Sequence, residues 1–70
     1  MAKTWRITLD GQSYNITHSE LLTDHLGQWS LHLSYGREII KTLCGSYQHL
    51  RELFDQCKAV GIHCERNSVD

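Results

Sequence analysis

Alternating hydrophobic and polar residues mark two short segments at the start of the chain. In residues 5–9 and 12–16 the large apolar side chains occupy every second position, which is the period of a half-buried β-strand. Asp10 and Gly11 lie between these segments and form a dipeptide typical of a two-residue hairpin turn. The pairs across such a hairpin are Trp5–Ile16, Ile7–Tyr14 and Leu9–Gln12. The sequence therefore predicts a hairpin whose large apolar side chains share one face.

A helix signal follows this hairpin. Thr17 and Glu20 have the spacing of a capping box, in which a hydroxyl and a carboxylate each bond a backbone amide of the first helical turn. Three leucines come next, and Gly27 is a typical helix terminator. We expect a short helix over about residues 18–26, which must be stabilised by packing because two turns alone do not persist in water.

The middle of the chain predicts a second hairpin. Residues 29–35 alternate strictly between apolar and polar side chains, as a half-buried strand does. The side chains expected to face inward are Trp29, Leu31, Leu33 and Tyr35. Residues 37–43 fit two structures, because their apolar residues have helical spacing whereas their β-branched side chains favour a returning strand. We adopt the strand for this segment.

The segment from Ser46 to Gly61 carries the clearest helix pattern. Ser46 is a favourable N-cap, and Gly61 is a favourable C-terminal stop. A continuous apolar stripe at helical spacing consists of Tyr47, Leu50, Leu53, Phe54, Cys57 and Val60. Residues 62–65 then alternate again and predict a last short strand, and residues 67–70 are expected to fray.

These elements combine into one two-layer α+β domain over residues 1–66. We expect an antiparallel sheet of four or five short strands, with the long helix of about residues 46–60 packed on its apolar face. The short helix would lie between the second and third strands. The opposite face of such a sheet is open to solvent. The 70 residues provide one small core, since a domain of this size buries only about 60% of the surface of its unfolded chain.

Charge and composition exclude several classes of function. Lys and Arg number 7 and Asp and Glu number 8, which gives a net charge of −1. This balance argues against a basic nucleic-acid-binding arm and against a polybasic membrane anchor. The apolar runs are too short for a signal peptide or a membrane span. Three cysteines without paired spacing indicate reduced thiols, so we expect a cytoplasmic protein.

No motif in the sequence predicts a metal, a cofactor or catalysis. Cys44, Cys57 and Cys64 are too far apart for the close ligand pairs of a structural zinc site. Cys57 lies in the apolar stripe of the long helix, where a small buried side chain is the ordinary explanation. The chain lacks a nucleophile elbow, a phosphate-binding glycine loop and the helix motif of zinc proteases. We therefore expect a protein that is not an enzyme and needs no cofactor or metal.

The open sheet face offers the candidate binding residues. On it we expect Arg6, Thr8, Asn15, Ser30, His32 and Ser34, with Tyr35 and Arg37 at the second hairpin turn. Short polar side chains lose little entropy when a partner orders them, and Tyr and Arg are common at interface hot spots. The sequence thus favours a non-catalytic protein-binding domain that docks on a larger protein or complex as an inhibitor or adaptor. The simpler alternative is that a polar face only keeps a small domain soluble.

Two other kinds of partner compete with this prediction. A nucleic-acid-associated regulatory protein is the alternative function, but the expected open face has Arg6 as its only cation and has its aromatic rings on the covered side. Unpaired strand edges would also allow two copies of the chain to join as a homodimer. The size of the chain, rather than any residue, suggests a phage or mobile-element protein directed against a host or defence complex.

Overall fold

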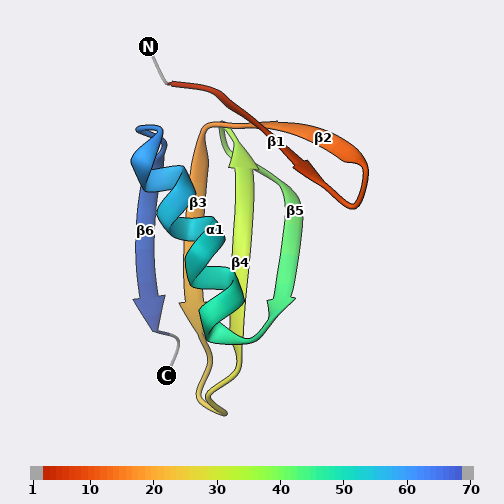
Figure 1. Ribbon diagram of the computed structural model, residues 1–70. Helices are drawn as coiled ribbons and strands as arrows, with labels where there is room; N and C mark the ends of the chain where they lie inside the picture. Colours follow the sequence, from red (N-terminus) through yellow and green to blue (C-terminus); the bar gives the residue numbers. More distant parts are fainter. Residues whose placement is uncertain (1–2, 69–70) are drawn as a thin grey trace.

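Six strands and one helix make up the part of the chain that the computed structural model describes, residues 3–68. They follow one another as β1 (Trp5–Leu9), β2 (Gln12–Ile16), β3 (His18–Thr23), β4 (Trp29–Tyr35), β5 (Glu38–Gly45), α1 (Tyr47–Ala59) and β6 (His63–Ser68). The strands form two sheets, the hairpin β1–β2 and a four-stranded sheet with the order β5-β4-β3-β6. Helix α1 lies across one face of the four-stranded sheet, and the hairpin crosses the end where β3 begins (Figure 1). The protein thus has the predicted α+β class.

The N-terminal hairpin has the predicted register. The pairs include Trp5–Ile16, Ile7–Tyr14 and Leu9–Gln12. Asp10 and Gly11 form the turn with φ values of 49° and 80°, the left-handed conformation that a type I′ turn requires at both positions. The hairpin does not extend the larger sheet. Ile7 and Ile16 are instead buried in one core with the side chains of β4 and α1, so the hairpin packs on the helix side of the larger sheet.

Residues 18–23 form a strand, and the prediction of a short helix over 18–26 is wrong. Strand β3 lies inside the sheet, antiparallel to β4 and parallel to β6, so it has backbone partners on both sides. The Thr17 hydroxyl accepts a hydrogen bond from the Gly36 amide at 2.8 Å instead of capping a helix. Tertiary pairing of this kind overrides a weak local helix preference. Helix α1 is the only helix between residues 3 and 68.

The four-stranded sheet is mixed, whereas the sequence predicted an antiparallel one. Helix α1 carries the chain back along the sheet after β5, so β6 begins at the same end as β5 and pairs parallel with β3. Strand β5 confirms the choice of strand over helix for residues 37–43. Strand β6 extends to Ser68, so two residues of the predicted frayed tail are in a strand, and residues 69–70 lie outside the described residues.

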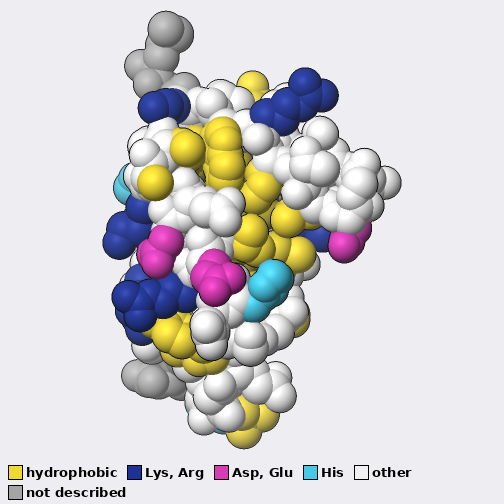
Figure 2. Space-filling view, viewed as in Figure 1, with side chains coloured by type: hydrophobic (Ala, Val, Ile, Leu, Met, Phe, Trp, Pro, Cys, Tyr) yellow, Lys and Arg dark blue, Asp and Glu magenta, His cyan; other side chains and the backbone are white. Residues whose placement is uncertain are grey.

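The core lies between the four-stranded sheet, α1 and the hairpin. Its buried hydrophobic side chains are Ile7, Ile16, Leu21, Leu31, Leu33, Leu50, Phe54, Cys57 and Ile62. The Ser46 side chain caps α1 by accepting from the His49 amide at 3.3 Å. Figure 2 shows the helix-side surface, where hydrophobic atoms form a strip between α1 and the hairpin. The predicted packing of the long helix on the sheet is confirmed.

Tyr35 does not face inward as predicted. It is 54% exposed, because it is the last residue of β4 and pairs with Glu38 beside the β4–β5 turn, beyond the buried core. The pairing of β4 with β5 also shifts between Leu33 and Ser34. The inward positions of β4 that the core does cover completely are Leu31 and Leu33.

Candidate functional site

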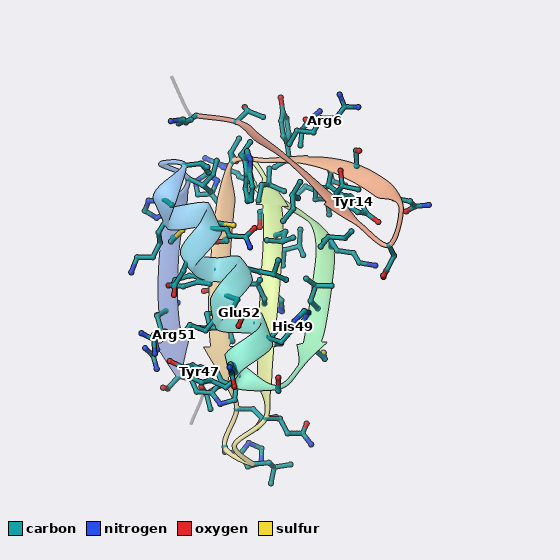
Figure 3. All side chains as sticks on the ribbon, viewed as in Figure 1. Arg6, Tyr14, Tyr47, His49, Arg51 and Glu52 are labelled. Carbon is teal, nitrogen blue, oxygen red and sulfur yellow. The ribbon has the colours of Figure 1, made fainter. Side chains whose placement is uncertain are left out.

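The structure divides the eight predicted contact residues among three surfaces. Arg6, Thr8 and Asn15 are on the exposed side of the hairpin, Ser30, His32 and Ser34 are on the open face of β4, and Tyr35 and Arg37 are at the β4–β5 turn. The apolar side of the hairpin packs on the helix side of the sheet, so its polar side points away from the molecule. Figure 3 shows Arg6 projecting outward from the hairpin. The structure therefore does not bring the three hairpin residues onto the open face, and that part of the prediction is wrong.

The open face of the four-stranded sheet carries linked histidine and carboxylate side chains. These residues, here called the histidine–carboxylate network, are His18 and Glu20 of β3, His32 of β4, and His63, Glu65 and Asn67 of β6. The strand register places Glu20 opposite both His32 and Glu65. Asn67 Nδ2 donates to Glu20 Oε2 at 2.7 Å, and His32 Nδ1 lies 3.7 Å from Glu20 Oε1. Glu20 therefore links three strands of the sheet.

The second half of the network surrounds His63. Its Nε2 donates to Glu65 Oε1 at 3.0 Å, and this hydrogen bond lowers the pKa of the Glu65 carboxyl. The rings of His63 and His18 meet edge to face, with centroids 5.2 Å apart. His18 Nδ1 in turn lies 2.6 Å from the Thr17 hydroxyl oxygen. The imidazoles are thus held in defined orientations on a face that is open to solvent.

A shallow hollow of about 170 Å³ lies among these side chains. The imidazoles of His18 and His63 and the carboxylates of Glu20 and Glu65 line it, together with Ser34 of β4. This volume holds a few water molecules or one side chain of a partner, and is below the range of about 300–1,000 Å³ that is typical of small-molecule sites. The hollow suits contact with a protruding group of a macromolecule.

Sequence reasoning found only part of this site. It placed His32, Ser30 and Ser34 on the open face because the alternation in β4 is clear. It missed His18 and Glu20 because the capping-box spacing favoured a helix there. The sequence of residues 18–23 has no clear period-2 alternation, because Ser19 is polar but buried and Leu22 is apolar but on the outward side, so no local signal marks this strand.

The three cysteines differ in exposure and in hydrogen bonding. Burial raises the pKa of the Cys57 thiol to about 11, so this thiol is protonated and inert near neutral pH. Cys64 Sγ accepts from the Ser19 hydroxyl at 3.1 Å and donates to the Ile62 carbonyl at 3.2 Å. Cys44 is exposed, and all three cysteines are free thiols. Within residues 3–68, no group of three or more His, Cys, Asp and Glu side chains is arranged to hold a metal ion.

Comparison with known proteins adds no further constraint. Protein-family models, curated proteins and solved structures all give no significant match to the chain. In the described part of the chain, α1 is too short and too polar to cross a membrane.

Proposed function

We propose that the protein is a non-catalytic binding domain that docks on a larger protein or protein complex through the open face of its four-stranded sheet, as an inhibitor or adaptor. The histidine–carboxylate network is the observation that carries this proposal. Its side chains contact one another across three strands on a face that the core does not use. A face that served only solubility would need polar groups but no contacts between them. Contacts that orient the side chains before binding reduce the entropy lost when a partner binds, so they favour a binding role for this face.

The chemistry of the open face fits a protein surface better than a nucleic acid. The described strand positions on this face include no Lys or Arg, whereas Glu20 and Glu65 would repel a phosphate backbone. Imidazoles can donate or accept hydrogen bonds near neutral pH, which suits the mixed polar groups of a protein. Ser30 and Ser34 add short hydroxyl side chains, which lose little entropy on binding.

A binding role, rather than catalysis, fits the state of the nucleophiles. No thiol of the described residues forms a hydrogen bond to a histidine, and an activated cysteine needs such a base beside it. Free thiols also fit a reducing compartment, so we place the protein in the cytoplasm. The exposed edges of β5 and β6 leave room for pairing with a second copy, which would not cover the open face.

Two matched variants test which surface binds. Ser34→Lys with Thr42→Lys, the β5 residue opposite His32, changes the open face away from the β3–β4 loop. Thr8→Lys with Asn15→Lys makes the same charge change on the hairpin. Each is immobilised beside the wild type and exposed to a native lysate of the source organism, and captured proteins are quantified by mass spectrometry. We expect a protein that the wild type and the hairpin variant retain and the open-face variant loses. Circular dichroism confirms that both variants are folded.

The captured protein is then purified and its direct binding is measured by calorimetry. We expect the open-face variant to bind at least about tenfold more weakly, which corresponds to about 1.4 kcal/mol. Equal binding by both variants, or no captured protein above the level of empty beads, would contradict the proposal. If only the hairpin variant loses binding, the contact surface is the exposed side of the hairpin rather than the open face of the sheet.

A further inference from the structure

Two aromatic rings and two arginines form a cluster on the helix side of the molecule. Trp29 of β4 and Tyr47 of α1 have ring centroids 4.5 Å apart. The guanidinium carbon of Arg66 lies 5.5 Å from the Trp29 centroid and 5.4 Å from that of Tyr47. Arg51 lies 5.8 Å from the Tyr47 centroid, and its Nη1 donates to the Tyr47 hydroxyl at 3.3 Å. These four residues are here called the aromatic–arginine cluster, and Figure 3 shows Tyr47 and Arg51 at the first turns of α1.

The cluster leaves its cationic groups available. Both arginines are exposed and both rings are half-buried. Stacking on a ring orients the plane of a guanidinium and leaves its N–H edges free to bind an anion. Asp55 Oδ2 lies 3.7 Å from Arg51 Nε, but both side chains are more than half exposed, so this ion pair is weak. None of the described carboxylates lies within 4.0 Å of Arg66.

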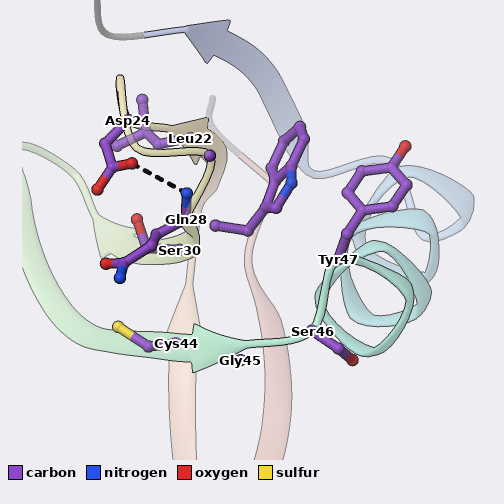
Figure 4. Close-up of a pocket in the computed structure, with 10 residues that line it drawn as sticks. Leu22, Asp24, Gln28, Ser30, Cys44, Gly45, Ser46 and Tyr47 are labelled. Atoms are coloured by element: carbon purple, nitrogen blue, oxygen red, sulfur yellow. Dashed lines mark hydrogen bonds between the residues drawn. The ribbon is translucent and has the colours of Figure 1, made fainter.

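A hollow of about 660 Å³ adjoins the cluster. Trp29 and Tyr47 belong to both, and Leu22 and Cys44 extend the apolar part of the lining (Figure 4). The β3–β4 loop forms one wall. Its shape is held by Asp24, whose Oδ1 accepts from the amides of Leu26 and Gln28 at 2.8 and 2.9 Å. The hollow is therefore bounded by a hydrogen-bonded loop rather than by loose chain.

Charge selects the class of ligand. Figure 2 shows Lys and Arg side chains beside a hydrophobic patch near the first turns of α1, with acidic side chains close by. Asp55 lies beside Arg51 on α1, and Asp24 lies in the lining of the hollow. A nucleic-acid backbone needs a continuous basic track, which these carboxylates interrupt. Two isolated guanidiniums beside an apolar hollow suit a ligand in which one or two carboxylates pair with the guanidiniums and a neighbouring hydrophobic side chain enters the hollow.

We infer that the aromatic–arginine cluster and the adjoining hollow bind a short acidic segment of a partner protein. A carboxylate of that segment binds the free edge of Arg66, with Arg51 in support, and a neighbouring aromatic or aliphatic side chain enters the hollow against Trp29 and Tyr47. Trp, Tyr and Arg are the residues most enriched at interface hot spots, and bidentate pairing with a carboxylate is the geometry that arginine favours. The aromatic–arginine cluster lies on the helix side, whereas the hollow reaches around the end of the sheet to Leu22, Ser30 and Cys44 at the border of the open face.

Selection from a random peptide library tests the site, because such a library samples many acidic segments at once. The library is displayed on phage and selected on the wild-type protein, with depletion on the Arg51→Gln, Arg66→Gln double variant. We expect the enriched peptides to place Asp or Glu beside an aromatic or aliphatic residue. A synthetic form of the best peptide should shift the NMR signals of the Trp29 indole and the Ser46 amide.

Matched variants then measure the contribution of charge. We expect Arg66→Gln to weaken the peptide by about tenfold, which is about 1.4 kcal/mol, whereas Arg6→Gln on the hairpin leaves the affinity unchanged. A version of the peptide with Asn and Gln in place of its acids should lose binding to the same extent. Failure to enrich any peptide, enrichment without acidic residues, or equal binding by Arg66→Gln would overturn the inference. Tighter binding of single-stranded DNA than of the peptide would replace it with a nucleic-acid site.

Discussion

Truncation of Leu50 should remove a large part of the stability of this domain. Leu50 lies on α1 and is 0% exposed, in contact with the core side of the sheet. Replacing a fully buried leucine by alanine costs about 2–5 kcal/mol, and more where the cavity cannot collapse. A domain of 70 residues has a total free energy of unfolding of about 4–10 kcal/mol. Leu50→Ala should therefore lower the free energy of unfolding by about 3 kcal/mol, which is between about 30% and 75% of the total.

Urea unfolding followed by tryptophan fluorescence measures this loss. With a slope of about 1 kcal/mol per molar urea for a chain of this size, the midpoint should fall by about 3 M. Leu26→Ala is the matched control, because Leu26 is 71% exposed in the β3–β4 loop, and it should change stability by less than about 0.5 kcal/mol. If Leu50→Ala loses no more than this control does, α1 is not packed on the sheet and the fold is wrong.

Three further predictions concern single groups. Thr17→Val should lower the free energy of unfolding in urea by about 1–3 kcal/mol, since it removes the hydroxyl that accepts a hydrogen bond from a turn amide. Thr17→Ser should retain most of the stability, and a valine variant as stable as the wild type would refute the role of the hydroxyl. A thiol reagent should label Cys44 in the native protein and Cys57 only after unfolding, because burial raises the pKa of the Cys57 thiol to about 11. Mass spectra that show equal labelling rates for the two thiols in the native protein would contradict this prediction. NMR titration should give the Glu65 carboxyl a pKa below its ordinary value, and His63→Phe should raise that pKa again. If the Glu65 pKa is the same in the His63→Phe variant as in the wild type, the hydrogen bond from His63 is not the cause of the lowering.

The Glu65 pKa also gives a direction for stability against pH. A carboxyl whose pKa is lower in the folded than in the unfolded state contributes stability above its unfolded pKa, and that contribution disappears as the pH falls through the folded pKa. The hydrogen bond from His63 is the largest cause of the lowering. The contribution is small because the Glu65 side chain is more than half exposed. It should therefore be detectable in the titration of Glu65 rather than in a change of the unfolding midpoint.

The elements that could be predicted from the sequence are those whose information lies within a few residues. Asp10 and Gly11 define the hairpin turn through their backbone conformation, and the alternating side chains on either side then determine the register. Ser46 likewise caps α1 through a contact three residues away. Local chemistry was sufficient for these elements, since no distant partner competes with it.

The elements that were missed depend on partners far along the chain. Thr17 and Glu20 have the spacing of a helix cap, but their polar groups bond to the β4–β5 turn and to Asn67. Ser19 bonds to Cys64 across a separation of 45 residues. The alternation in residues 62–65 predicted a last strand, but the extension of β6 to Ser68 and its parallel pairing with β3 have no local signal, because the added residues are polar and exposed. Periodicity indicates the face that a side chain occupies, but it does not identify the neighbouring strand.

The same limit explains why the two proposed surfaces could not both be found from the sequence. Periodicity predicts Trp29 and Tyr47 on the covered side, and they are on that side, but the core ends before it covers them. Arg66 completes the cluster from the last strand, one residue beyond the segment 62–65 in which the alternation predicted it. Trp29 and Ser30 are successive residues of β4, so the aromatic–arginine cluster and the open face lie on opposite sides of the same strand. A flat partner surface cannot contact both sides at once. Because Ser30 lines the hollow together with Trp29 and Tyr47, a partner that fills the hollow reaches the border of both surfaces at the end of the sheet. Partners that bind farther from the β3–β4 loop use one surface only.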